Sequence, residues 1–298
     1  MKILVTGASG LLGRALYYSL SESDAHFNLK GTAFSRSSDK LIKLNLLDNS
    51  AVRKAVSDFK PDLIIHAAAE RRPDIVKNNP EAAEKLNVSA VSTIAEAAEG
   101  AGAALLYMST DYVFDGTMPP YTIDSEPNPL NSYGRMKLEG EIIVLTTCSR
   151  PIILRVPILY GKVETLAESA VTSIANGITT DSPSFHDDEA IRYPTHVEDV
   201  ANVIAGLAER LSLDEDLNGI FHWSSDSPYT KYQMALVMAD VMGVDRSMIR
   251  KAAPNPDAAP RPMNSQLETS RLRKMGINPK TDFNAAIRDI LIDAKTIS

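Results

Sequence analysis

Residues 5–14 read Val5-Thr6-Gly7-Ala8-Ser9-Gly10-Leu11-Leu12-Gly13-Arg14. Three glycines stand here with the spacing G-x-x-G-x-x-G, after an apolar run that predicts a strand and before a pattern that predicts a helix. The first glycine permits a tight turn, the second lets the backbone approach a pyrophosphate, and the third lets the helix pack close to the sheet. The helix would direct N–H groups and a partial positive charge at the phosphates. We therefore predict a dinucleotide-binding turn with contacts from Gly7, Ser9, Gly10, Leu11, Leu12 and Gly13.

Short apolar runs alternate with longer helical patterns over the first half of the chain, which is typical of βαβ units. We expect strands at residues 2–6, 28–34, 40–44, 62–66, 103–108 and 151–156, and helices at residues 11–20, 51–59, 80–99 and 131–145. Most of these strands are nearly continuous in Val, Ile and Leu, as parallel strands covered on both faces should be. The sequence therefore predicts an α/β fold with a Rossmann-type doubly wound parallel sheet.

The alternation loosens after Tyr160. We expect helices at 197–211, 231–242 and 282–294, and a strand at 219–223. The first of these helices would begin with a capping box formed by Thr195 and Glu198. Residues 181–192 are expected to form a loop or short edge strand, and the proline-rich residues 251–262 an extended segment. Trp223 is expected in the core of this smaller region. We predict two domains: a dinucleotide-binding domain at 1–160, and a smaller α/β substrate- or partner-binding domain at 161–298 that returns some chain to the first.

Composition limits the partners and the compartment. The chain has 298 residues and a formal net charge of -7, which argues against nucleic acid and anionic membranes as partners. The single cysteine, Cys148, suits a reducing compartment. Met1 leads directly into an apolar strand, so we expect no leader peptide, and no apolar run reaches the roughly 18 residues that a membrane crossing needs. We expect a cytoplasmic protein.

The end of the second expected strand indicates which cofactor is bound. It reads Ala33-Phe34-Ser35-Arg36, with no acid before Asp39. An NAD site usually places an acid here for the ribose 2′-hydroxyl. Arg36 instead offers a planar guanidinium suited to a 2′-phosphate, and Ser35 adds a hydroxyl donor. The segment favours NADP(H), the alternative being that Arg36 is only a solvated surface arginine.

Three further segments are candidate cofactor contacts. Asn45 and Leu46 end the third expected strand, where an amide and an apolar side chain suit an adenine. The small residues Ala67, Ala68 and Ala69 follow the fourth strand and would let the backbone approach the cofactor. Arg71 could face a cofactor phosphate, with simple solvent exposure as the alternative.

Tyr133 and Lys137 form a Y-x-x-x-K pair on an expected helix, where residues i and i+4 share one face. An ammonium close to a tyrosine stabilises the phenolate and lowers its pKa from the usual value of about 10. The lysine can also hold a nicotinamide ribose, and the tyrosine can then protonate a carbonyl oxygen as hydride arrives.

Ser109 and Thr110 come directly after the fifth expected strand, at the carboxyl edge where open α/β sheets bind ligands. Their hydroxyls could hold a substrate carbonyl, so the sequence predicts a reductase-type site of Ser109, Thr110, Tyr133 and Lys137. We expect no metal, because the acidic run 187–189 lacks further ligands. His66 and His196 are expected to be structural or capping residues.

Several motifs resemble the extended short-chain dehydrogenases/reductases, in particular their dTDP-4-dehydrorhamnose reductase branch. Residues 109–116, STDYVFDG, and 261–267, RPMNSQL, are similar to that branch. Within it, the chain resembles the regulatory beta subunits of methionine adenosyltransferase, through residues 67–73, AAAERRP, and through 168–172, 193–197 and 221–224. Some members of that family end in an aromatic, basic extension, whereas this chain ends Lys295-Thr296-Ile297-Ser298.

The resemblance implies an NADP(H)-binding regulatory protein that associates with the catalytic subunit making S-adenosylmethionine. It implies cofactor contacts at residues 9–12, 34–36 and 45–46, and at Ala67, Arg71, Tyr133 and Leu159. The second hypothesis is a working NADPH-dependent reductase of a 4-keto-6-deoxy nucleotide sugar, because Thr110, Tyr133 and Lys137 are all present. The resemblance favours the regulatory role, and whether the site turns over substrate stays open.

Overall fold

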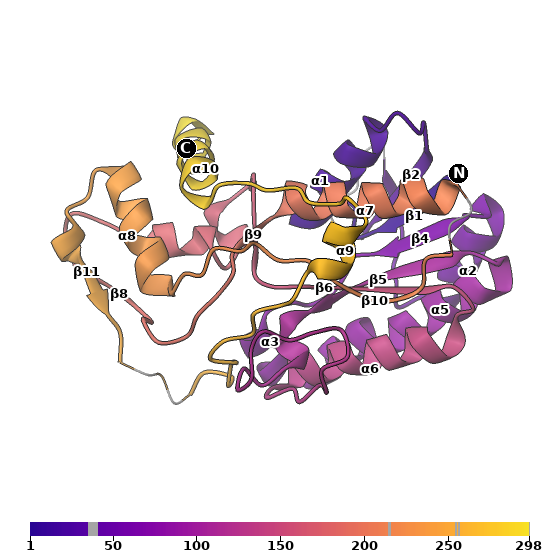
Figure 1. Cartoon of the computed structure of the whole chain (residues 1–298), viewed down its shortest axis with the longest axis horizontal. Helices are drawn as coiled ribbons and strands as arrows, with labels where there is room; N and C mark the ends of the chain where they lie inside the picture. The colour runs from indigo at the N-terminus through magenta and orange to yellow at the C-terminus, as the bar shows by residue number, and fades with distance from the viewer. Residues whose placement is uncertain (35–40, 214–215, 254, 256, 298) are drawn as a thin grey trace.

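A seven-stranded, all-parallel sheet forms the centre of the molecule in the computed structural model (Figure 1). The structure describes residues 1–34, 41–213, 216–253, 255 and 257–297, with side chains up to 294. The strand order is β10-β6-β5-β4-β1-β2-β3. The strands are β1 Lys2–Thr6, β2 Asn28–Ala33, β3 Leu41–Lys43, β4 Leu63–His66, β5 Ala104–Thr110, β6 Pro151–Val156 and β10 Gly219–His222. The predicted doubly wound parallel sheet is confirmed, and its order reverses between β1 and β4, where such folds bind ligands.

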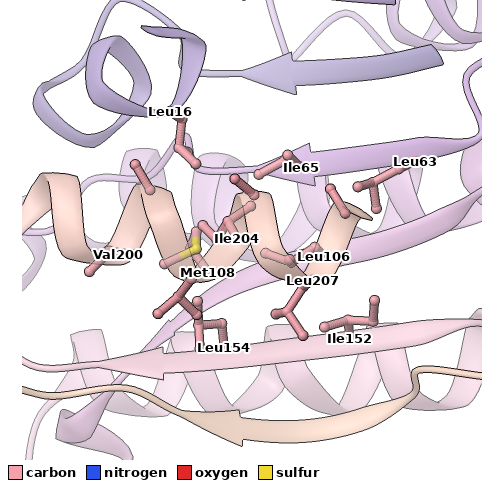
Figure 2. Packing of buried hydrophobic residues seen from close by; sticks show 14 of the residues in the cluster. Leu16, Leu63, Ile65, Leu106, Met108, Ile152, Leu154, Val200, Ile204 and Leu207 are labelled. Atoms are coloured by element: carbon pink, nitrogen blue, oxygen red, sulfur yellow. The ribbon is translucent and has the colours of Figure 1, made fainter. Parts of the chain in front are cut away.

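Helices cover both faces of the sheet (Figure 1). The covering helices are α1 Leu11–Ser21 and α7 Val197–Ser212 on one face, and α2 Asn49–Phe59, α5 Ala90–Ala101 and α6 Ser132–Thr147 on the other. Alternate residues of each strand point to opposite faces. Ile65, Leu106 and Leu154 therefore meet Leu16 of α1 and Ile204 of α7 (Figure 2), whereas the residues beside them on these strands pack under α2, α5 and α6.

The single helix expected over residues 80–99 is three consecutive segments: α4 Pro80–Glu84, a π-helical turn Lys85–Ser89, and α5. The π turn holds the buried Asn87, whose amide donates to the Glu70 carbonyl and accepts from the Glu70 N–H, both at 2.9 Å. Such bulges re-aim a side chain within a helix. Here the bulge anchors the segment that follows β4, and this segment leads into the unpredicted short helix α3 Pro73–Asn78.

The smaller region lies beyond the edge at which β5 and β6 end (Figure 1). Its elements are the paired strands β7 Leu159–Tyr160 and β9 Thr195–His196, the paired strands β8 Ser184–His186 and β11 Ile249–Lys251, and the helices α8 Lys231–Met242 and α10 Phe283–Ile297. The short helix α9 Ser270–Lys274 instead packs on β10 of the large sheet through the buried Leu272 (Figure 1). Short 3-10 helices lie at Asp111–Val113, Leu166–Glu168, Thr172–Gly177 and Arg246–Met248. Its own core packs Tyr160 against Met234 and Met238 of α8 and Phe283 and Ile287 of α10.

Two expectations for this half were wrong. Helix α7 is capped by His196, whose Nδ1 accepts the Glu198 N–H at 3.4 Å, while Thr195 lies in β9 and its hydroxyl accepts the Ser225 N–H instead. Trp223 packs in the cluster of the large sheet and not in the core of the smaller region, because β10 and α7 return to that sheet. The boundary at residue 160 stays a prediction.

Among the described residues, none of the helices has the combination of length and apolar character that a membrane crossing requires.

Candidate functional site

The glycine-rich turn joins β1 to α1 at the point where the strand order reverses. Gly7 has φ +72°, and a Cβ there would lie 2.9 Å from the Cα of Ala68. A Cβ on Gly13 would lie 2.1 Å from the carbonyl oxygen of Gly7. Gly10 is the N-cap of α1, and no side chain caps this end. Because the first N–H groups of a helix have no partner within it, this end of α1 can receive an anionic group.

The residues predicted to contact the cofactor after β4 lie beside this turn. The Ala67 N–H donates to the Thr6 carbonyl at 3.3 Å, and Ala68 lies against Gly7. Leu12, Ala67 and Leu159 are half-buried together at the margin of the sheet core. The geometry thus brings Leu159 of β7 to the cofactor side of the sheet, although 92 to 147 residues separate it from the others.

The adenine end is more open. Phe34 is 61% exposed at the end of β2, and Asn45 is exposed with its Oδ1 accepting the Leu47 N–H at 3.1 Å. Leu46 is buried in the core under α2, so its side chain packs against the protein. The predicted contacts Ser35 and Arg36 lie outside the described residues.

Two arginines bind Glu168 of the smaller region next to the glycine-rich turn. Arg14 of α1 binds both carboxylate oxygens of Glu168, at 2.8 and 2.7 Å, and also donates to the Ser9 carbonyl. Arg71 is exposed and donates to the Glu168 carbonyl oxygen. The sequence analysis did not single out Arg14, although its place directly after the third glycine was a signal.

Helix α6 carries the Y-x-x-x-K pair to the ends of the strands. It is capped by Asn131, whose Oδ1 accepts the Gly134 N–H at 2.9 Å and whose amide donates to the Pro260 carbonyl at 2.8 Å. Thr110, which ends β5, lies close enough to the Tyr133 hydroxyl to oppose the rise of its pKa. The structure therefore brings Thr110, Tyr133 and Lys137 to the same edge of the sheet.

Burial dominates the electrostatics of this pair. The ammonium of Lys137 lies 3.8 Å from the centre of the Tyr107 ring, and burial lowers its pKa to about 7, against the opposing effect of Glu141. Burial also raises the pKa of Tyr133 well above its usual value, although the neighbouring Thr110 hydroxyl acts in the other direction. The sequence suggested a lowered pKa for this tyrosine, whereas its burial in the structure raises it.

Ser109 takes part in a buried polar cluster. Its hydroxyl donates to Oε1 of the buried Glu141, which also forms a buried ion pair with Arg155 of β6 at 2.6 Å. His222 of β10 lies next in line, with its Nε2 3.3 Å from Arg155 Nη1. The sequence analysis missed this cluster, although an arginine in an apolar strand and a glutamate one turn after Lys137 were signals.

Asp111 was also missed. Its carboxylate is 3% exposed and accepts from the hydroxyls of Thr110 and Ser265, and burial raises its pKa to about 6. Ser265 belongs to the motif at residues 261–267, which packs on the motif at residues 109–116: a Cβ on Gly116 would lie 2.7 Å from the Met263 nitrogen. Two motifs that are far apart in the sequence therefore form one wall of the site.

Three cations of the smaller region lie near this wall. The Arg192 guanidinium lies 5.9 Å from the centre of the Tyr112 ring, and Arg261 pairs with Asp74 at 2.5 Å. Burial, together with the charges of Arg261 and Arg192, lowers the pKa of Lys231. Such a cluster suits an anionic group bound between the two parts of the site.

No group of three or more His, Cys, Asp or Glu side chains that could hold a metal occurs in the described part of the chain. The acidic run contributes to packing instead, since Asp188 accepts from Thr230 at 2.7 Å and pairs with Lys251 at 2.7 Å.

The chain is similar to known proteins over nearly its whole length. The family model of the RmlD substrate binding domain matches residues 1–296. The methionine adenosyltransferase 2 subunit beta of Xenopus laevis is 48% identical over 292 residues, which cover 97% of this chain and 87% of that protein. A dTDP-4-dehydrorhamnose reductase of Aggregatibacter actinomycetemcomitans is 30% identical, over 97% of this chain and 98% of that protein. The crystal structure of a dTDP-4-dehydrorhamnose reductase from Clostridium acetobutylicum superposes with a TM-score of 0.83 at 27% identity, covering 99% of this chain and all of that one.

Proposed function

Because the chain belongs to the RmlD substrate binding domain family, and within it to the family of the methionine adenosyltransferase 2 beta subunits, we propose that it is an NADP(H)-binding regulatory subunit. Its partner is the methionine adenosyltransferase catalytic subunit of its own cell, and its role is to support S-adenosylmethionine synthesis. The observation that carries the proposal is the 48% identity to a beta subunit over nearly the whole chain.

The cofactor half of the proposal rests on geometry. The uncapped amino end of α1, the close approach of Gly7 to Ala68 and the half-buried Leu12, Ala67 and Leu159 form a surface that suits a dinucleotide. Lys137, at the same edge of the sheet, suits the nicotinamide ribose. The choice of NADP(H) over NAD(H) rests on Ser35 and Arg36 in the sequence.

The second candidate function is an NADPH-dependent reductase of a 4-keto-6-deoxy nucleotide sugar. The proximity of Thr110 to the Tyr133 hydroxyl favours it, because the two hydroxyls could hold and protonate a substrate carbonyl. The cations Arg192, Lys231 and Arg261 support an anionic ligand in the same site. The identity to the reductases is lower, which is why this function is second.

The test is co-purification with the source's own methionine adenosyltransferase catalytic subunit. We expect a stable complex, and a rate of S-adenosylmethionine synthesis that changes when this chain is added. Absence of a complex, together with NADPH oxidation on a dTDP-4-keto sugar that is lost in Tyr133→Phe, would overturn the regulatory proposal. Tyr18→Phe is the matched control for that variant, because Tyr18 is 68% exposed on α1.

We also propose the division of labour between residues 1–160, which hold the cofactor, and residues 161–298, which face the substrate or partner. The cytoplasm is the proposed location, supported by the buried, unpaired Cys148, which suits a reducing compartment.

A further inference from the structure

A chain of buried polar side chains runs behind the Y-x-x-x-K pair. Ser109, Arg155 and His222 occupy paired positions on the neighbouring strands β5, β6 and β10, so they form a row across the sheet. Glu141 of α6 packs against this row. All four side chains are at most 4% exposed. They form one connected cluster, because Ser109 and Arg155 both bind Glu141 and His222 Nε2 accepts from Arg155.

We propose that Glu141 is a positioning residue, which with Arg155 ties α6 to the carboxyl ends of β5 and β6 and supplies the counter-charge that keeps Lys137 an ammonium facing the cofactor. The proposal rests on the NADP(H) binding proposed above. In this proposal Ser109 belongs to the cluster of Glu141 and Arg155, and Thr110 is the hydroxyl beside Tyr133.

The geometry of Glu141 fixes the helix. Arg155 holds both of its carboxylate oxygens, at 2.9 Å through Nε and 2.6 Å through Nη2, and such bidentate pairs tolerate little displacement. One residue earlier, Gly140 lets α6 approach the sheet closely, since a Cβ there would lie 2.2 Å from the Tyr107 hydroxyl. Lys137, one turn before Glu141, is thereby set over the face of the Tyr107 ring.

The charges around Lys137 explain why an ionised Glu141, and not an apolar residue, stands one turn after it. The groups that face it are Glu141 on α6, the Tyr107 ring on β5 and His66 on β4, and the cation bound to Glu141 is Arg155 of β6. Burial holds His66 neutral by lowering its pKa to about 3, so it supplies no positive charge. Burial raises the pKa of Tyr107 well above its usual value, so it supplies no negative charge. Glu141 is therefore the anion of this set, and its charge opposes the loss of the Lys137 proton.

Stability alone does not explain a buried pair of this kind. Taking a carboxylate and a guanidinium out of water is unfavourable for each ion, and well-packed apolar residues often stabilise a fold as well or better. A role of the Glu141–Arg155 pair in positioning Lys137 and keeping it protonated explains why a buried ion pair stands here.

The test follows the Lys137 side chain directly by NMR, in protein labelled with carbon-13 at the lysine ε-carbons, with Lys137→Met to assign the signal. We expect the wild-type signal to titrate near pH 7 and the Glu141→Gln signal at least about one pH unit lower. At pH 7 the protonated fraction would then fall from about one half to about one tenth, which predicts NADPH binding about fivefold weaker. Near pH 5.5 the two proteins should bind almost equally. An unchanged Lys137 titration, or a loss of affinity that is the same at every pH, would overturn the proposal.

Two further variants protect the test against a folding defect. Glu141→Asp keeps the charge and should return the Lys137 titration most of the way to that of the wild type. If Glu141→Gln does not fold, the double variant Glu141→Gln, Arg155→Met leaves no unpaired guanidinium and should still titrate below the wild type; a titration at or above the wild-type value would contradict the proposal. The control is Asp240→Asn, which breaks the exposed ion pair with Arg246 next to α8 and should leave Lys137 unchanged.

The outcomes separate this inference from the proposed function. If the wild type binds no NADPH but Glu141→Gln shifts the Lys137 titration, the inferred support stands and the cofactor proposal fails. If NADPH binds and the titration does not move, the cofactor proposal stands and the role of Glu141 is refuted.

Discussion

The two ends of the site are built in different ways. The phosphate end is made by the backbone of one continuous stretch, residues 5–14, in which small side chains let β1, α1 and the residues after β4 approach closely. The other end is made by buried polar side chains from β5, β6, β10 and α6, among them Glu141 and Arg155. The first end depends on space, and the second depends on charge.

This difference decides what each end tolerates. A turn built from close backbone contacts cannot accept even one added methyl group, because the atoms that it would meet are main-chain atoms that cannot move aside. A cluster of buried charges does not tolerate the loss of one partner, because the other is then left as an unpaired ion. Four changes test the contrast, from the largest expected effect to the smallest.

Gly7→Ala should have the largest effect. It places a side chain at φ +72° and a Cβ 2.9 Å from the Ala68 backbone, so we expect a loss of about 2 kcal/mol or more in unfolding free energy and loss of measurable NADPH binding. Urea unfolding and fluorescence titration measure both. Gly100→Ala is the control: its Cβ would meet nothing within 4 Å and it lies in α5, so stability should hold or rise by up to about 1 kcal/mol. Equal effects of the two variants would show that the turn is not sterically closed.

Arg36→Ala should weaken NADPH binding by about 10- to 100-fold and NADH binding little, because only NADPH carries the 2′-phosphate that a guanidinium would bind. Parallel titrations with the two coenzymes measure the ratio. Arg53→Ala, which removes an exposed arginine paired with Glu96, should leave the ratio unchanged. Equal losses for both coenzymes in Arg36→Ala would refute the 2′-phosphate contact.

His66 joins the two ends, since its Nδ1 lies 2.6 Å from the Thr6 hydroxyl and its ring stacks on Tyr107. Burial lowers its pKa to about 3, so the unfolded chain binds one more proton there below pH 6.5 and stability falls as the pH falls from about 6.5 towards 3. Between pH 7.5 and pH 5 this amounts to about 2 kcal/mol. His66→Gln should remove that part of the pH dependence in urea unfolding, whereas His26→Gln, in an exposed loop, should not. An identical slope in wild type and His66→Gln would contradict a neutral, buried His66.

The ion pair of Arg14 and Glu168 should give the smallest effect, because the Arg14 side chain is 29% exposed to solvent. We expect a coupling energy of about 1 kcal/mol for NADPH binding in a double-mutant cycle of Arg14→Met and Glu168→Gln. A cycle on the exposed pair Lys54 and Asp58 of α2 is the control and should give no coupling to NADPH. Additive losses at Arg14 and Glu168 would mean that this pair does not support the cofactor turn.

Much of the fold was predictable because its signals are local. The strands of residues 2–156 and the turn at residues 7–13 follow from apolar runs and glycine spacing within a few residues. The helix of residues 80–99 was predicted as one piece, because nothing in the sequence shows that Asn87 must turn inward to bind Glu70. The Thr195 capping box was wrong for the same reason: Thr195 pairs with Leu159 in a strand, and that pairing overrides a local capping preference.

The candidate site was predictable in its parts and not in its connections. Tyr133 and Lys137 share a helix face by their spacing, which the sequence shows directly. The partners of Asp111 and Ser109 come from elsewhere: Ser265 lies 154 residues after Asp111, and Glu141 lies 32 residues after Ser109.

The amino-acid order therefore determined by itself the alternating strands and helices that predict a parallel sheet, the phosphate turn and the shared face of the tyrosine and the lysine, because each depends on residues close together in the sequence. Only the tertiary structure decided that Arg155 meets Glu141, that Arg14 meets Glu168 and that Trp223 belongs to the large sheet. The physical reason is that a buried charge requires a partner, but the order of the strands, not the order of the residues, determines which partner lies within reach.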